Sequence, residues 1–415
     1  MARRTSRDIR VAHRLQLLRS VIAGGTVSRQ ELVRESGLSA ATVSNLTGEL
    51  LAAGLLREAG FQESGGGRPR ALLSACPQGG VLAGVDVAET YVHVELFDTA
   101  LTPLGRYEET LHPRENRPEQ VVRHLADGLR AAVRASGVRP AHLLGAGVSV
   151  PGQVDHGGGV SVFAPNFDWH DVPLRELLRA GLNRPRTGPG LPRDLPLYLD
   201  NPLRAGVLAE LWFGAGRGHE DIAVLTLGTG VGAGLAFGGS LYRGATNSAG
   251  EWGHTNLVPG GRPCHCGALG CLESYVGAPG IMQTLRERAP GSRLLHPDDQ
   301  TATIDALARG LAEGDPDAVA TVSVTAGHLG LAVADLVNLV NPEVVVLGSW
   351  VAARLGEPLL ERVRAVVARQ ALGRPLAAAR IVGSSLPGNS VSLGAATFAL
   401  EGLLAGIGSG AAAAR

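Results

Sequence analysis

The spacing of apolar residues divides the chain into an N-terminal stretch of short amphipathic helices and a longer stretch in which strands and helices alternate. In the first stretch, Ser28 and Ser39 stand at the N-cap positions of helical patterns, and a glycine between those patterns supplies a tight turn. Strand-like residues then flank a glycine-rich loop over 61–70. The predicted helices span 8–23, 29–36 and 40–54. This order predicts a winged helix-turn-helix domain over residues 1–80.

The remaining chain repeats one pattern twice. Residues 81–99 and 221–239 each form two strands joined by a tight turn, and helices and further strands follow both. This repetition predicts an α/β domain over residues 81–405, built from two related lobes around a cleft. The Ala- and Gly-rich residues 406–415 predict a disordered tail. Further strands are predicted at 103–111, 143–150, 343–348 and 379–384, and helices at 117–136, within 302–341, at 357–371 and at 391–405.

Composition and charge indicate where the protein is located and what kind of partner it binds. The sequence has no apolar run long enough to cross a bilayer and no apolar N-terminal signal segment, so we expect a cytoplasmic protein with no membrane partner. The net charge is zero, but residues 1–75 hold 11 Arg against 6 Asp and Glu, a net charge of +5. A basic end on a neutral protein indicates an anionic partner, although a solvated basic arm fits equally well.

The third predicted helix and the wing carry side chains suited to duplex DNA. Thr42, Ser44 and Asn45 are small and polar and can approach base edges in a major groove. The same three residues also fit a merely solvated helix face. The wing sequence GGGRPR shifts the balance toward DNA, because flexible glycines precede Arg68 and Arg70, which can enter a narrow, A·T-rich minor groove.

One cluster points to a metal ion. His254, Cys264, Cys266 and Cys271 follow the spacing H-x9-C-x-C-x4-C and offer one imidazole and three thiolates. Four soft ligands leave no open position, which is typical of a structural zinc site rather than a catalytic one. The alternative is that the three cysteines are simply reduced. Because Cys76 stands apart, the pattern does not indicate a secreted disulfide framework.

The order of motifs along the chain resembles the ROK family of sugar kinases and sugar-responsive repressors. The motifs are GVSVPGQVD, PNFDWHDVPL, LTLGTGVGAG, AGEWGH and CHCGALGCLE, and they cover most of the chain. The resemblance implies a two-lobed, actin-like (ribonuclease H-like) fold with a sugar between the lobes. The N-terminal winged helix-turn-helix is similar to that of the repressor branch, which includes the xylose and N-acetylglucosamine repressors.

The resemblance also implies a sugar site. In related kinases the residues matching Asn201, Glu251, His254 and Glu273 hydrogen-bond sugar hydroxyls, and Asn166 is expected to line the same pocket. Carboxylates and amides suit this role, because they pair with vicinal hydroxyls. In the alternative interpretation, Glu251 and Glu273 only support the cysteine-rich hairpin.

Three departures from the kinase pattern predict lost catalysis. The family's kinases carry an aspartate base at the position of Pro202, and removal of a general base costs about 10²–10⁴-fold in rate. Asp200 would share a strand face with Pro202 but lie about 6–7 Å away. The first phosphate loop reads DVAET instead of Asp-x-Gly-Gly-Thr, and GSW replaces a glycine-rich turn near 348. Only GTGVG, at 228–232, keeps the kinase pattern, so no ATP binding and no enzyme activity are expected.

Three hypotheses follow. The chain is a regulator whose kinase-like domain senses a sugar, an active sugar kinase with an added DNA-binding domain, or a DNA-binding protein whose second domain only dimerises. The retained Glu251, His254 and Glu273 favour the first. Its expected partners are an inverted-repeat DNA operator and a sugar or sugar-derived effector, and the expected assembly is a homodimer or homotetramer. Repression rather than activation is implied by the resemblance.

Overall fold

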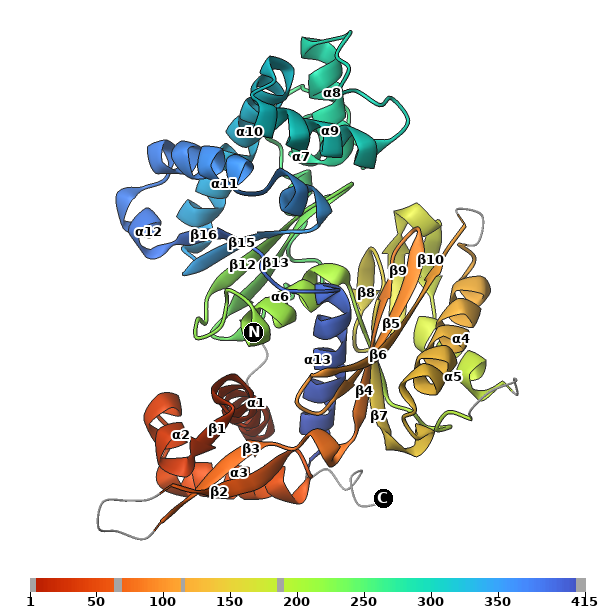
Figure 1. Ribbon diagram of the computed structural model, residues 1–415, viewed down its shortest axis with the longest axis vertical. Helices are drawn as coiled ribbons and strands as arrows, with labels where there is room; N and C mark the ends of the chain where they lie inside the picture. The colour runs from red at the N-terminus through yellow and green to blue at the C-terminus, as the bar shows by residue number, and fades with distance from the viewer. Residues whose placement is uncertain (1–4, 63–68, 113–115, 185–189, 408–415) are drawn as a thin grey trace. The chain divides into compact units, whose positions relative to one another are not determined.

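The computed structural model divides the chain into two compact units, each with a buried core of its own (Figure 1). The first unit comprises residues 1–205 and 388–415, and the second comprises residues 206–387. The structure describes residues 5–62, 69–112, 116–184 and 190–407. The predicted disordered tail therefore lies outside the described residues beyond 407, and residue 406 belongs to the last helix instead.

The N-terminal elements form the predicted winged helix-turn-helix. Ser28 begins α2 with a capping box, in which its hydroxyl accepts from the Glu31 amide and the Glu31 carboxylate accepts from the Ser28 amide. Ser39 caps α3 in the same sense, by accepting from the Thr42 amide. Strands β2 and β3 pair antiparallel as the wing, and the wing tip with Arg68 lies outside the described residues. The elements are α1 (Ser6–Gly24), β1 (Thr26–Ser28), α2 (Arg29–Ser36), α3 (Ala40–Ala52), β2 (Leu56–Gln62) and β3 (Arg70–Ala75).

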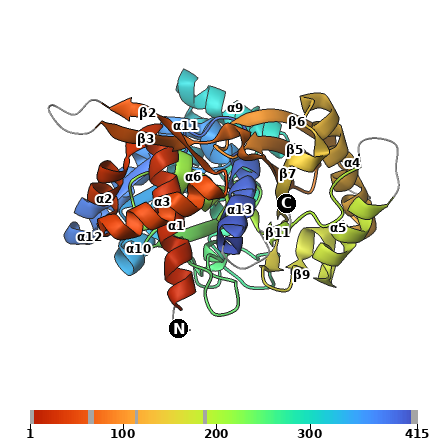
Figure 2. The ribbon, with the colours of Figure 1, turned by 90° about the horizontal axis from the view of Figure 1, so that it is seen from below.

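A five-stranded sheet forms the centre of the first unit, with the order β11-β7-β4-β5-β6. Helix α4 packs on one face through a core that includes Val85 and Leu125, and α13 packs on the other face (Figures 1 and 2). Central strand β4 is buried on both faces, which explains its unbroken run of buried residues. The elements are β4 (Val81–Val87), β5 (Tyr91–Asp98), β6 (Pro103–Thr110), α4 (Pro118–Ser136), β7 (Leu143–Ser149), β11 (Leu197–Asp200) and α13 (Ser390–Gly406).

The second unit repeats that sheet. Its order β14-β13-β12-β15-β16 has the same pairing sequence as β6-β5-β4-β7-β11, namely two antiparallel pairs followed by two parallel pairs. The two related α/β lobes predicted from the sequence are therefore confirmed. The strands are β12 (Ile222–Leu227), β13 (Val231–Phe237), β14 (Ser240–Leu241), β15 (Val344–Gly348) and β16 (Arg380–Gly383).

Helices of the second unit depart from the sequence predictions in two places. By length and composition α10 (Pro316–Val340) could span a membrane, contrary to expectation, but many of its side chains lie buried in the core of this unit. The predicted helix 357–371 is the second part of α11 (Trp350–Gln370), because Gly356, with φ of 54°, breaks the helical backbone. Helix α6 (Pro202–Phe213) begins in the first unit and ends in the second. The other helices of the second unit are α7 (Glu273–Val276), α8 (Ala278–Arg288), α9 (Gln300–Glu313) and α12 (Gly373–Ala378).

A small sheet that the sequence patterns did not predict lies in the first unit, in the order β10-β9-β8. Its strands are only three to five residues long, so alternation of apolar and polar residues is too short to detect there. The sheet carries the turn that contains Asn166, and helix α5 follows it. These elements are β8 (Gln153–Asp155), β9 (Val160–Ala164), β10 (Trp169–Val172) and α5 (Leu174–Asn183).

Candidate functional site

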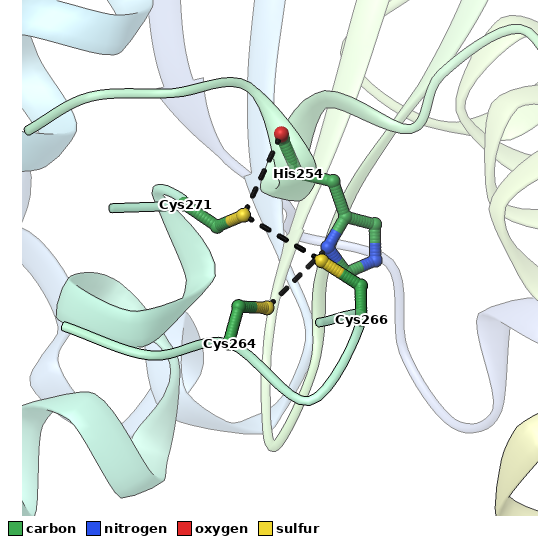
Figure 3. A group of neighbouring side chains, drawn as sticks. All are labelled: His254, Cys264, Cys266 and Cys271. Carbon is green, nitrogen blue, oxygen red and sulfur yellow. Dashed lines mark hydrogen bonds between the residues drawn. The ribbon is translucent and has the colours of Figure 1, made fainter. Parts of the chain in front are cut away.

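Four predicted metal ligands come together in the second unit. His254 ends a short 3-10 turn, Cys264 and Cys266 lie on the following loop, and Cys271 precedes α7. Figure 3 shows their side chains pointing toward one another, and one ligand atom from each lies within 4.8 Å of all the others. Cys264 and Cys271 are buried, whereas Cys266 is exposed. All four cysteines of the chain are free thiols.

The separations between these atoms fit a tetrahedral ion. Zn–S bonds of about 2.3 Å and Zn–N bonds of about 2.0–2.1 Å in a tetrahedron place two sulfurs about 3.8 Å apart and a sulfur and a nitrogen about 3.6 Å apart. Here Cys266 Sγ lies 3.7 Å from Cys271 Sγ, and Cys264 Sγ lies 3.6 Å from His254 Nδ1. The sulfurs are too far apart for a disulfide. The donor set and its spacing therefore fit a closed zinc site.

The loop backbone brings the thiols together. The Cys264 amide donates to the Ala268 carbonyl and the Gly267 amide donates to the Cys264 carbonyl, which closes a tight turn between the cysteines. Gly270 has a φ of 80°, and a Cβ there would lie 1.8 Å from the Val258 carbonyl oxygen. Only glycine fits that position. The positive φ at Gly270 therefore lets the loop pass close to Val258.

The loop is also held from outside. The guanidinium of Arg262 donates to the carbonyl oxygens of Ser274 and Gly280 and lies over the Tyr275 ring. The Tyr275 hydroxyl in turn accepts from the Arg262 amide at 2.8 Å. These contacts join the start of the cysteine loop to helices α7 and α8, so the loop has a fixed base. Sequence reasoning did not single out Arg262, because its partners lie 12, 18, 22 and 25 positions further along the chain.

The thiols differ in acidity. Burial, with the neighbouring sulfurs, raises the pKa of Cys271 to about 12, whereas a backbone hydrogen bond from Ala268 lowers the pKa of Cys266.

Glu273 joins the cysteine loop to the predicted sugar-binding residues. Its carboxylate is 9% exposed; Oε2 accepts from the Val231 amide at 2.8 Å, and Oε1 lies 3.1 Å from His265 Nδ1. His254, His265 and Glu273 form a second close group, and Glu251 lies exposed at the turn that leads into His254. Sequence reasoning missed His265, although it stands between two predicted ligands.

The other two predicted sugar-binding residues lie in the first unit. Asn201 is 7% exposed and follows β11, and its Nδ2 donates to the Gly152 carbonyl at 3.5 Å. Asn166 is exposed, and its Nδ2 donates to Glu89 Oε1 at 2.6 Å. Glu89 belongs to the DVAET segment, so the altered loop and the predicted sugar residue are in direct contact.

The strand tip differs from the sequence prediction. Asp200 ends β11, but Pro202 is the first residue of α6, so the two do not share a strand face. The reason is local: Asn201 Oδ1 accepts from the Arg204 amide as a helix N-cap, and proline is favoured in the first helical turn. Asp200 is fully buried and its Oδ1 accepts from Arg204 Nη1 at 2.7 Å. That pairing ties up the carboxylate.

In the two other segments that depart from the kinase pattern, DVAET and GSW, protein side chains contact the positions in question. Asp86 is buried and accepts from the Tyr91 hydroxyl at 2.8 Å and from Asn389 Nδ2 at 2.9 Å, and its burial raises its pKa. In the second unit, Ser349 and Trp350 lie against Gly228 of the GTGVG turn: a Cβ on Gly228 would be 3.0 Å from Ser349 Oγ and 3.2 Å from Trp350 Nε1. An indole ring therefore packs on the glycine turn that resembles a phosphate loop.

The predicted DNA-reading residues lie on one helix and one strand. Ser44 and Asn45 are exposed on α3, and Thr42 is half-buried with its Oγ1 2.8 Å from Ser39 Oγ. Arg70 is exposed at the start of β3. The structure thus presents Ser44, Asn45 and Arg70 to solvent and uses Thr42 partly in capping the helix.

Comparison with known proteins gives consistent matches. The model of the ROK family matches residues 82–401. The xylose repressor of Caldicellulosiruptor bescii is 30% identical over 396 residues, which cover 94% of this chain and 96% of that repressor. The glucokinase of Thermotoga maritima is 34% identical over 293 residues, 69% of this chain and 87% of the glucokinase. A ROK family transcriptional regulator homologous to the E. coli MLC protein has the same fold, with a TM-score of 0.76 at 24% identity over 95% of this chain and 98% of that one.

Proposed function

This chain belongs to the ROK family, and on that premise we propose that it is a sugar-responsive transcriptional repressor of carbohydrate-metabolism genes whose kinase-like domain is inactive. The observation that carries the proposal is the winged helix-turn-helix joined to the kinase-like fold within one chain. The match to a xylose repressor extends over 94% of the chain, whereas the glucokinase match extends over 69%. A cytoplasmic homodimer or homotetramer is the proposed assembly.

DNA recognition is assigned to α3 and the wing. We propose that Thr42, Ser44 and Asn45 contact bases in the major groove, and that Arg68 and Arg70 enter an A·T-rich minor groove. The exposure of Ser44, Asn45 and Arg70 supports this assignment. A symmetric dimer would read an inverted repeat with half-sites one helical turn or a multiple apart. Asn45→Ala should relax base preference at one position in each half-site, at a cost of about 1–3 kcal/mol.

The proposed loss of kinase activity rests on three sites. Pro202 cannot accept a proton, and the buried ion pair with Arg204 removes Asp200 as a substitute base. Glu89 places a carboxylate where the kinase pattern has a glycine, which would repel a phosphate. Trp350 packs on the remaining glycine turn. Each feature alone would impair phosphoryl transfer, so we propose that ATP is neither bound nor used.

The proposed effector is a sugar or a sugar derivative, held by the side chains that match the kinases' sugar-binding residues. They are Asn166, Asn201, Glu251, His254 and Glu273. A structural zinc ion would be held by His254 and the three clustered cysteines, and it would supply no chemistry beyond cross-linking the loop. The ion would also fix His254 beside Glu273, which couples metal content to sugar binding.

A thermal-shift screen of a sugar panel, with and without ATP, tests the sensing role. A ligand that binds only the folded state raises the melting temperature. The proposal predicts a shift with at least one sugar and no further change when ATP is added. A shift that requires ATP, together with ADP release, would instead indicate an active sugar kinase. No shift with any sugar would leave a DNA-binding protein that has lost sensing.

A further inference from the structure

An arginine of α1 is buried within the first unit. Arg14 is 4% exposed, although charged side chains are rarely buried without partners. It lies on the same helix face as the buried residues Leu17, Leu18 and Val21. These residues belong to the core of the winged helix-turn-helix, residues 6–75, which we call the reading head. A charge in that position must be matched by hydrogen-bond acceptors, because an unpaired buried charge is strongly destabilising.

Arg14 finds those acceptors on two different elements. Its Nε donates to Glu49 Oε2 at 2.6 Å, and Glu49 lies on α3, the predicted DNA-reading helix. Its Nη1 donates to the carbonyl oxygens of Leu404 and Ile407, at 3.2 and 3.1 Å, at the C-terminal end of α13. The last carbonyls of a helix carry partial negative charge, so a guanidinium there is favourable. One side chain thus bridges α3 and α13.

Two neighbouring arginines contact these partners separately. Arg10 pairs with Glu49, and Arg7 Nη2 donates to the Ala405 carbonyl at 3.3 Å. Arg7 and Arg10 are exposed, whereas Arg14 is buried. Helices α1 and α13 are in direct contact (Figures 1 and 2). The chain therefore offers matched controls for each half of the Arg14 bridge.

Helix α13 is seated closely on the sheet of the first unit. A Cβ on Gly84 of β4 would lie 1.9 Å from the Ser392 carbonyl oxygen, and one on Gly147 of β7 would lie 1.7 Å from that of Ala395. Helix and sheet backbones touch at these points, so α13 has little freedom to shift. Its N-terminal end is tied to β4 as well, because Asn389 donates to Asp86.

We propose that Arg14 is a positioning residue for DNA reading: it fixes α3 against α13 and so sets the angle at which the reading head leaves the kinase-like domain. The inference rests on the proposed function and adds a residue that touches no DNA. Two heads of a dimer must match the spacing of an inverted repeat, so a loosened head lowers sequence-specific affinity more than non-specific affinity.

The test uses full-length protein and two labelled duplexes of equal length, one from the DNA upstream of the protein's own gene and one unrelated. Arg14→Ala should weaken binding to the upstream duplex by about 10- to 100-fold, since charged hydrogen bonds are lost, and change binding to the unrelated duplex little. Arg14→Lys keeps the positive charge but not the several N–H donors of the guanidinium. It should therefore recover only part of the preference for the upstream duplex over the unrelated one. Arg7→Ala and Arg10→Ala should each have smaller effects.

A second readout needs no DNA. In Arg14→Ala, amide hydrogen exchange should accelerate in peptides spanning 40–52 and 398–407, while exchange in the second unit stays unchanged. Equal duplex preference in Arg14→Ala and the parent protein, or unchanged exchange at both helix ends, would overturn the positioning role. If the parent protein itself shows no preference for the upstream duplex, the proposed function fails, and the exchange result still decides whether Arg14 joins the two helices.

Discussion

The tip of β11 and the cysteine loop of the second unit differ in how their polar side chains are paired. At the strand tip, Asp200, Asn201 and Arg204 satisfy one another through a buried ion pair and a helix cap. In the loop, the sulfurs of Cys266 and Cys271 lie 3.7 Å apart, and Cys271 Sγ also donates to the His254 carbonyl oxygen at 3.7 Å. A thiol pair is a poor hydrogen-bonding arrangement but a good pair of zinc ligands.

This contrast separates a strand tip whose carboxylate is paired within the protein from a loop whose side chains could bind an ion. At the strand tip, Asp200 Oδ1 accepts from both the Arg204 guanidinium and the Asn201 amide. The cysteine loop places four possible metal-ligand atoms within 4.8 Å of one another, and His254 and Glu273 belong to a second close group. Under the proposed function, the strand tip has lost the catalytic base, whereas the cysteine loop keeps residues that match the kinases' sugar ligands.

The largest expected effect follows loss of the metal. Cys271→Ser should reduce zinc from one ion per chain to near zero and lower the melting temperature by about 10 °C or more, because a structural site supplies several kcal/mol of folding free energy. Elemental analysis and thermal melting measure both. Cys76→Ser, a free cysteine in the first unit, is the matched control and should change neither. If the parent protein keeps its melting temperature after its metal is removed, the cysteine loop does not depend on an ion and the contrast with the strand tip is wrong.

The next largest effect tests the closed strand tip. Arg204→Ala should lower the free energy of unfolding by about 3–5 kcal/mol, because it leaves the Asp200 carboxylate buried without its ion-pair partner. Urea denaturation measures the change. Arg179→Ala, an exposed arginine of the same unit, should stay within about 0.5 kcal/mol of the parent. A loss below about 1 kcal/mol for Arg204→Ala would mean that the tip is open to water.

A smaller effect is expected when the missing base is restored. Pro202→Asp should change stability by no more than about 1 kcal/mol, since aspartate is also acceptable in the first turn of α6. It should give no ADP release with any sugar, because Glu89 and Trp350 remain. A coupled ADP assay decides this. Turnover of about 1 s⁻¹ or more in the variant would show that Pro202 is the only obstacle to phosphoryl transfer, and that Glu89 and Trp350 do not prevent it.

The smallest expected effect is on the pH dependence of the first unit's stability. Burial lowers the pKa of His93, but hydrogen bonds to Glu95 and Glu108 outweigh burial and raise it overall. The stabilisation is therefore present below the unfolded pKa of about 6.5 and is lost as pH rises through the higher folded value. Urea melts from pH 6 to pH 9 should show falling stability, and His93→Gln should flatten that fall. A steeper fall in the variant would reverse the assigned sign.

The sequence predicted the parts of the molecule that depend on local pattern. Capping residues such as Ser28 and Ser39 located the helices of the reading head, and the repeated strand–turn–strand segments located both sheets. The close spacing of the cysteines sufficed to bring three of the four metal ligands together. In each case the deciding residues lie within about 20 positions of one another.

Features built from distant residues could not be predicted. Arg14 meets Leu404 across 390 positions, and nothing in either segment marks the other. The position of Pro202 was misjudged because a strand was extended past Asp200, whereas the cap formed by Asn201 had already begun a helix. His265 was missed although it is close in sequence to its partner Glu273, because Glu273 was considered as a sugar ligand or as a support for the hairpin and not as a partner for a histidine.

The central claim is that this protein binds DNA and responds to a sugar without phosphorylating it. Fluorescence anisotropy of the full chain on a duplex from the DNA upstream of its own gene, titrated with D-xylose and other neutral sugars in the absence of ATP, tests it most directly. The account predicts tight, salt-dependent binding to this duplex over an unrelated one, and at least a tenfold loss of affinity with one of the sugars. Equal affinity for both duplexes, or a sugar response that appears only when ATP is added, would contradict it.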